Sequence, residues 1–140
     1  MTELELQAQV ADYLRLQYPH VLFHSDFGSG IKLTPGQAMR QKRLQGGRRS
    51  WPDMFIAEPK QLAGREEPLH GLFLELKRDG VRLYKRDGDL VANEHIREQA
   101  KLHFELKQKG YWANFACGFD EAKEIIDWYL GEPAKEEVEF

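Results

Sequence analysis

The sequence predicts a single α/β domain with a central mixed β-sheet flanked by helices. Two observations carry this prediction. First, the chain has 140 residues, of which 41 % are hydrophobic and 31 % charged, so it is a soluble globular chain with room for one core. Second, helical and strand patterns follow one another as helix, strand, short helix, two strands, helix, strand and helix. We expect the domain to span residues 1–130, followed by an acidic tail at 131–140.

The N-terminal elements are marked by strong boundary signals. Thr2 and Glu5 have capping-box spacing and predict a helix to about Gln17. A first strand is expected at 21–27. Thr34-Pro35 then predicts the start of a short basic helix that ends near Gln45, because a capping residue followed by proline favours a helix N-terminus.

The middle of the chain predicts two adjacent strands, at 53–57 and 71–77. The pair Asp87-Gly88 stands between two short apolar runs and predicts a small β-hairpin appended to the second of these strands.

The C-terminal elements continue the alternation. Apolar residues recur at helical spacing between 93 and 109, and Gly110 has the position of a C-terminal cap. A fourth strand is expected at 111–116. Asp120 is predicted to cap a last helix that runs to about Leu130.

The strand at 71–77 places an acid and a lysine on one face. Side chains alternate along a strand, so Glu75 and Lys77 project together, opposite to Leu72, Leu74 and Leu76. Asp53 opens the preceding strand, and its carboxylate can reach Glu75 if the two strands are neighbours. Two converging carboxylates need compensation, which Mg²⁺ or Mn²⁺ provides. The simpler reading of each residue is an exposed strand charge.

Two further polar residues face apolar surroundings. On a helical projection of residues 2–17, Glu3 falls inside the apolar face whereas Glu5 falls outside it. Gln99 projects from the inward side of the helix at 93–109. An inward carboxylate or amide needs a partner, which a metal site provides. If the helix has another register, Glu5 rather than Glu3 is the inward carboxylate of the metal site. The simpler alternative is that Glu3 lies in a frayed first turn, faces solvent and has no role.

The histidines and the single cysteine are expected to be structural. We predict that His103 is buried with its hydrogen bonds satisfied, and we assign no role to His20, His24 or His95. Cys117 excludes an internal disulfide and forms no zinc-binding spacing.

The charges are distributed unevenly. The tail at 131–140 holds four glutamates against one lysine, a net charge of −3 that equals that of the whole chain. The segment 27–52, in contrast, contains no acidic residue, which is typical of a surface that binds phosphates. A solvated charged face is the other reading. The basic residues of this segment are Lys32, Arg40, Lys42, Arg43, Arg48 and Arg49.

These motifs resemble a known family. The segment from Gly46 to Ile56, which contains Pro52-Asp53, together with Leu72–Lys77, Gln99 and Gly110-Tyr111, is similar to the VRR-NUC domain of the PD-(D/E)xK nucleases. The resemblance extends from the first helix to Ala122. The resemblance implies a restriction-endonuclease-like core with a basic insert and a hairpin insert. Within the family, the chain is similar to the stand-alone, phage-type members.

The resemblance also implies roles for individual residues. Asp53 and Glu75 would hold the divalent metal, with the Leu76 carbonyl as a further ligand. Lys77 would position the attacking water, and Gln99 and Glu3 would complete the catalytic set.

The function expected is hydrolysis of DNA phosphodiesters by a metal-dependent endonuclease, with a Holliday-junction resolvase that acts as a homodimer as the leading expectation. Trp112, Phe115, Trp128 and Tyr129 are candidates for the dimer interface, although core packing is the simpler reading. Nucleases that prefer flap, nicked or single-stranded DNA, and a DNA-binding module without catalysis, are the alternatives. The sequence shows no apolar run that spans a bilayer and no signal-peptide pattern at Met1, so we expect an intracellular protein encoded by a bacterium or phage.

Overall fold

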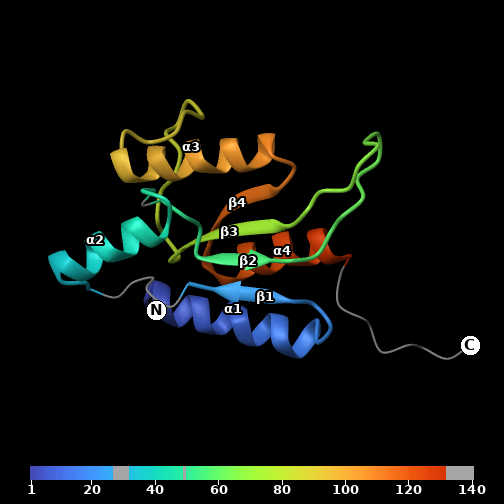
Figure 1. The fold of residues 1–140 in the computed structure, drawn as a ribbon. Coiled ribbons are helices and arrows are strands. Elements are labelled where there is room, and N and C mark those ends of the chain that lie inside the picture. The colour runs from blue at the N-terminus through green and yellow to red at the C-terminus, as the bar shows by residue number, and fades with distance from the viewer. Residues whose placement is uncertain (27–31, 49, 132–140) are drawn as a thin grey trace, which may run out of the picture.

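The computed structural model describes residues 1–26, 32–48 and 50–131. Its centre is a four-stranded sheet in the order β1-β2-β3-β4, with strands Phe23–Ser25, Met54–Ile56, Leu72–Lys77 and Trp112–Cys117 (Figure 1). The predicted site residue Arg49 lies outside the described residues, as does the acidic tail beyond Gly131.

The sheet is mixed, as the sequence predicts. β1, β2 and β3 are antiparallel neighbours, and β3 and β4 run parallel. A parallel pair needs a crossover connection, and α3 (Glu94–Gln108) lies on that crossover. The strand order and the helix positions confirm the predicted α/β architecture.

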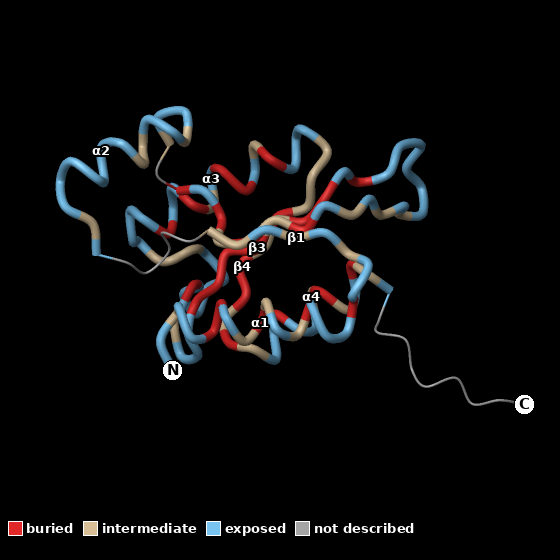
Figure 2. The backbone as a smooth tube through the Cα atoms, turned by 60° about the horizontal axis from the view of Figure 1, so that its bottom comes forward, coloured by how far each residue is buried: buried red, intermediate tan, exposed pale blue. Residues whose placement is uncertain are grey.

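One face of the sheet is covered by α1 (Glu3–Gln17) and α4 (Gly118–Leu130), and the main core lies between them and the strands (Figures 1 and 2). Leu72, Leu74 and Leu76 of β3 point into this core and are at most 1 % exposed. The leucines of β3 therefore face the core beneath α1 and α4, whereas the residues between them face the opposite side of the sheet. The two helices are joined through Asp127, which accepts hydrogen bonds from Tyr13 (2.6 Å) and Tyr18 (2.7 Å).

The opposite face is covered by α3, which buries Ile96, Leu102 and Leu106 against β4 and its surroundings. Asn93 caps this helix by accepting a hydrogen bond from the amide of Ile96. Glu75 and Lys77 point toward this second face, where α3 shields them from solvent.

Helix α2 (Pro35–Leu44) projects beside the sheet and buries none of its residues (Figures 1 and 2). Its first turn is held by a capping box between Thr34 and Gln37. Because α2 contributes nothing to the core, its position depends on its own capping and on the segment that follows it.

Two elements, β1 and α4, differ from their predicted bounds by more than one residue. β1 is shorter than 21–27, because the amide of Val21 bonds back to the Tyr18 carbonyl and leaves the strand to begin at Phe23. The predicted small hairpin around Asp87-Gly88 is present, with its antiparallel pairing limited to one bridge between Tyr84 and Leu90. α4 begins at Gly118 rather than after Asp120, because Gly118 adopts a φ of 83°, which turns the chain directly from β4 into the helix.

Within the described residues, no helix combines the length and apolarity needed to cross a lipid bilayer.

Candidate active site

Asp53 and Glu75 are brought together by strand pairing. The β2–β3 register sets Met54 opposite Leu74, so Asp53, one residue before β2, lies opposite Glu75 on the same face of the sheet. The Asp53 carboxylate accepts a 2.7 Å hydrogen bond from the amide of Leu76 through Oδ2. This bond fixes Asp53 at the C-terminal end of β3, where Glu75 and Lys77 also stand.

Glu75 is a buried carboxyl group, with 3 % of its surface exposed. Burial, followed by the hydrogen bond and negative charge of Asp53, holds the pKa of Glu75 well above its ordinary range, and the positive charge of Lys77 opposes this only in part. Burial and the neighbouring Asp53 therefore outweigh the positive charge of Lys77 at the Glu75 carboxyl group.

Gln99 holds Glu75 from the opposite side. Its amide donates a 2.8 Å hydrogen bond from Nε2 to Glu75 Oε1, and the same nitrogen lies 3.2 Å from His95 Nε2. The buried Oε1 of Gln99 has no hydrogen-bond partner among the residues that the structure describes. A buried carbonyl oxygen without a donor is costly in a closed core, so its position beside two carboxylates favours a site that a ligand or water completes.

Lys77 is 7 % exposed, and its ammonium group forms no ion pair or hydrogen bond with another side chain that the structure describes. Lysine is rarely buried without a partner. Its position two residues after Glu75 on the same strand face directs its positive charge toward the carboxylates.

These residues line a cleft of about 550 Å³ between the sheet, α2 and the start of α1. Glu3 lines it from the first turn of α1, whereas Glu5 is exposed and completes the capping box with Thr2. The structure therefore places Glu3, and not Glu5, in the cleft. The five predicted catalytic residues that line it are Glu3, Asp53, Glu75, Lys77 and Gln99.

The fold is similar to that of a VRR_NUC domain protein. This solved structure matches 94 % of the present chain and 89 % of its own chain with a TM-score of 0.61 and 22 % sequence identity. At that identity the likeness concerns the fold, and it confirms the restriction-endonuclease-like α/β class. The sequence matches no family model and no curated protein.

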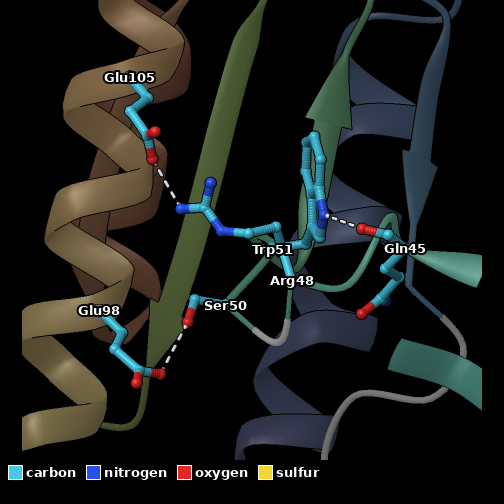
Figure 3. A network of polar contacts seen from close by, with 6 residues as sticks. All are labelled: Gln45, Arg48, Ser50, Trp51, Glu98 and Glu105. Atoms are coloured by element: carbon cyan, nitrogen blue, oxygen red, sulfur yellow. Dashed lines mark hydrogen bonds and ion pairs between the residues drawn. The ribbon is translucent and has the colours of Figure 1, made fainter. Parts of the chain in front are cut away.

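The predicted phosphate-binding residues occupy different positions in this VRR_NUC-like fold. Lys42 lines the cleft from α2, and Lys32, Arg40 and Arg43 are exposed nearby along the chain. Arg48 differs from them, because its guanidinium group forms a 2.6 Å ion pair with Glu105 of α3 (Figure 3). Its charge is therefore partly neutralised within the protein.

The segment between α2 and β2 is attached to both neighbouring helices (Figure 3). Arg48 and Ser50 bond to Glu105 and Glu98 of α3, the latter at 3.3 Å. The Trp51 indole donates a 3.1 Å hydrogen bond to the carbonyl of Gln45, at the end of α2. This attachment fixes the approach of the chain to Asp53.

Two of the cleft residues that sequence reasoning missed lie beside the predicted catalytic residues. His95, to which we assigned no role, lines the cleft and contacts Gln99, and Trp51 lines it beside Asp53. The helical spacing of His95 and Gln99, four residues apart, was the available signal. His103 was predicted to be satisfied, but its Nε2 is buried without a hydrogen-bond partner.

The predicted interface aromatics are mostly internal. Phe115 and Tyr129 are 8 % and 2 % exposed, and both belong to core clusters. Trp128 is 45 % exposed and packs on Trp112 with ring centroids 5.6 Å apart. Of the four, Trp128 therefore offers the largest exposed surface for a partner.

The cleft fits a hard divalent cation. No group of three or more His, Cys, Asp or Glu side chains in the described part of the chain is arranged to hold a metal. Mg²⁺ nevertheless binds proteins through one or two carboxylates and several waters, and Asp53 and Glu75 are such a pair. The raised pKa of the buried Glu75 carboxyl group agrees with this occupant, as does the Gln99 oxygen, which has no hydrogen-bond partner among the described residues.

Proposed function

We propose that this protein is a divalent-metal-dependent endonuclease that hydrolyses DNA phosphodiester bonds, a phage-type VRR-NUC member of the PD-(D/E)xK nucleases. The observation that carries this proposal is the convergence of the Asp53 and Glu75 carboxylates beside the buried Lys77 in one cleft. A protein that only binds nucleic acid has no need of two carboxylates facing a phosphate.

Asp53 and Glu75 are the residues that would hold Mg²⁺ or Mn²⁺, together with the carbonyl of Leu76. The metal would supply charge neutralisation at the phosphate and a lower pKa for bound water. Gln99 keeps the Glu75 carboxylate oriented through its 2.8 Å hydrogen bond. Lys77 provides a fixed positive charge where negative charge develops during the displacement. Glu3 lies close enough to Glu75 to raise its pKa further and adds negative charge to the metal side of the cleft.

The basic residues would hold the DNA backbone. Lys42 reaches the cleft itself, and Lys32, Arg40 and Arg43 extend this positive surface. Contacts of this type bind phosphates without reading sequence, so the affinity should fall steeply as the salt concentration rises. We assign Arg48 a smaller share, because Glu105 already pairs with it.

We propose branched DNA as the substrate, with the four-way junction as the leading candidate. Resolution of such a junction requires two cuts, which a two-fold homodimer supplies through paired sites. Of the four predicted interface aromatics, the half-exposed Trp128 has the largest surface available for such an interface.

The test is cleavage of labelled DNA in three forms: four-way junction, linear duplex and single strand. Each is incubated with Mg²⁺, Mn²⁺ or EDTA, using wild-type protein, Lys77→Met and the exposed control Lys85→Met. We expect metal-dependent cutting that Lys77→Met abolishes and Lys85→Met retains. Paired cuts across the junction support the resolvase. Salt-sensitive binding without cutting in either metal would instead identify a non-catalytic DNA-binding module.

A further inference from the structure

A row of rings crosses the sheet next to the carboxylates. The strand register places His24 opposite Phe55 and Phe55 opposite Phe73, all on the face that carries Asp53 and Glu75. The rings of Phe55 and Phe73 lie 4.5 Å apart. Gly71 allows this arrangement, because a Cβ there would come within 2.6 Å of the Phe55 ring.

Trp51 stands at the end of this row. Its ring centroid is 6.1 Å from that of Phe73, and its indole N–H is bound to the Gln45 carbonyl. The side chain is nevertheless 37 % exposed. A tryptophan that is fixed in orientation but open to solvent is a preorganised surface for stacking.

These rings line a second cavity, of about 470 Å³, which shares wall residues with the catalytic cleft. The residues shared by both cavities are Asp26, Gln45, Trp51 and Asp53. Phe55 is two residues from Asp53 along the chain, a separation of about 7 Å on an extended strand. The aromatic pocket therefore lies directly beside the carboxylates of the cleft.

We propose that this aromatic pocket binds an unpaired DNA base next to the phosphate that is cut. The proposal rests on the nuclease function above and names the feature by which branched DNA is selected. Every base has a flat π face, so stacking on Trp51 and Phe73 requires no particular sequence.

The pocket lining itself carries the carboxylates of Asp26 and Asp53, and the cations that favour nucleic acid over an apolar peptide stand beside it on α2. The C-terminal end of α2 forms one wall of the pocket through Leu44 and Gln45, and the last turn of this helix carries Lys42 and Arg43. A base in the pocket would thus have its backbone near two cations on one side and the Asp53 carboxylate with its metal on the other.

A base within a continuous duplex is stacked on its neighbours and must be extruded before it can enter, which costs a few kcal/mol. A nucleotide at a branch point or flap is already unpaired and avoids this cost. The pocket therefore selects DNA whose bases are unpaired beside the cleavage position. In a four-way junction, a base can enter the pocket when the base pairs at the centre of the junction open.

The test uses 2-aminopurine, a fluorescent base that is quenched by stacking, at the first unpaired nucleotide of a flapped duplex. Binding is measured in EDTA with wild type, Trp51→Leu, Trp51→Phe and the exposed-ring control Phe104→Ala on α3. We expect quenching on binding with wild type and with Phe104→Ala. Trp51→Leu should lose the quenching and bind the flap about tenfold more weakly, as expected for the loss of one stacked base. Trp51→Phe should be intermediate.

A second variant covers the case in which Trp51→Leu disturbs the fold. His24→Ala removes an exposed ring from the far end of the pocket and should also weaken the quenching. Unchanged quenching and flap affinity in both Trp51→Leu and His24→Ala would overturn the proposal. Quenching by Trp51 in a protein that cuts no DNA would sustain the base pocket while refuting the nuclease, so the two failures are distinguishable.

Discussion

The Gln99 amide donates a hydrogen bond to Glu75 Oε1 at 2.8 Å, which joins the middle of α3 to the end of β3. Both residues are almost fully buried, at 4 % and 3 % exposure. The orientation of the Glu75 carboxylate is therefore set by a helical residue that lies 24 positions away in the sequence.

Replacement of Gln99 by alanine should reduce cleavage by about 10- to 100-fold, because Glu75 then loses the group that orients it. Steady-state cleavage rates at several Mg²⁺ concentrations measure this effect, and part of the activity should return at high metal. The exposed Gln108→Ala on the same helix is the matched control. Equal activity of both variants would show that Gln99 orients nothing needed for the reaction.

Replacement of Glu75 by glutamine should stabilise the metal-free protein by about 1 kcal/mol at pH 8, because it removes a buried carboxyl group that Asp53 repels. The same variant should lose the increase in thermal midpoint that Mg²⁺ gives wild type. Thermal unfolding in EDTA and in Mg²⁺ measures both effects, with the exposed Glu66→Gln as control. A Mg²⁺ response that survives in Glu75→Gln would exclude this residue as a ligand.

His103 should make stability depend on pH between its ordinary pKa of 6.5 and its folded value. Burial, with the positive charges of Lys107 and Lys77, lowers the pKa of His103 to about 4. The unfolded chain therefore binds the proton first, and stability falls as the pH decreases from 6.5 toward 4. Urea unfolding of wild type and His103→Leu at pH 7 and pH 4.5 should show that the variant loses about 2 kcal/mol of this difference. Identical pH dependence in both proteins would contradict the prediction.

Asp127→Asn should reduce the free energy of unfolding by about 1–3 kcal/mol, because Asp127 accepts hydrogen bonds from two tyrosines that connect α1 to α4. Burial opposes ionisation of Asp127, but hydrogen bonds from Tyr13, Lys123 and Tyr18 outweigh it and lower its pKa below 3.8. This stabilisation is present above pH 3.8 and is lost as the pH falls through the folded pKa. Urea unfolding at pH 7 should show no comparable loss for the exposed Asp12→Asn.

The fold and the centre of the site could be predicted because they depend on local patterns. Alternation along β3 separates Glu75 and Lys77 from the leucines, and helical spacing turns Gln99 inward. These placements follow from backbone geometry once the element type is known.

The features that could not be predicted from the sequence depend on contacts between segments that are distant along the chain. Trp51 lines the cleft only because its indole bonds to Gln45 and its ring packs on Phe73. The ion pair of Arg48 with Glu105 spans 57 residues, so the basic segment gave no sign that one of its cations is neutralised. The length of the hairpin could not be predicted, because Asp87-Gly88 indicates a turn but not how far pairing extends beyond it.

Helix α2 forms a wall of the cleft without contributing to the core. Its sequence is consequently free of the packing constraints that govern α1, α3 and α4. Under the proposed function, residues of this helix are the ones whose exchange should alter which DNA is accepted without disturbing the core. Under the proposed function, substrate choice and stability therefore depend on different residues of the chain.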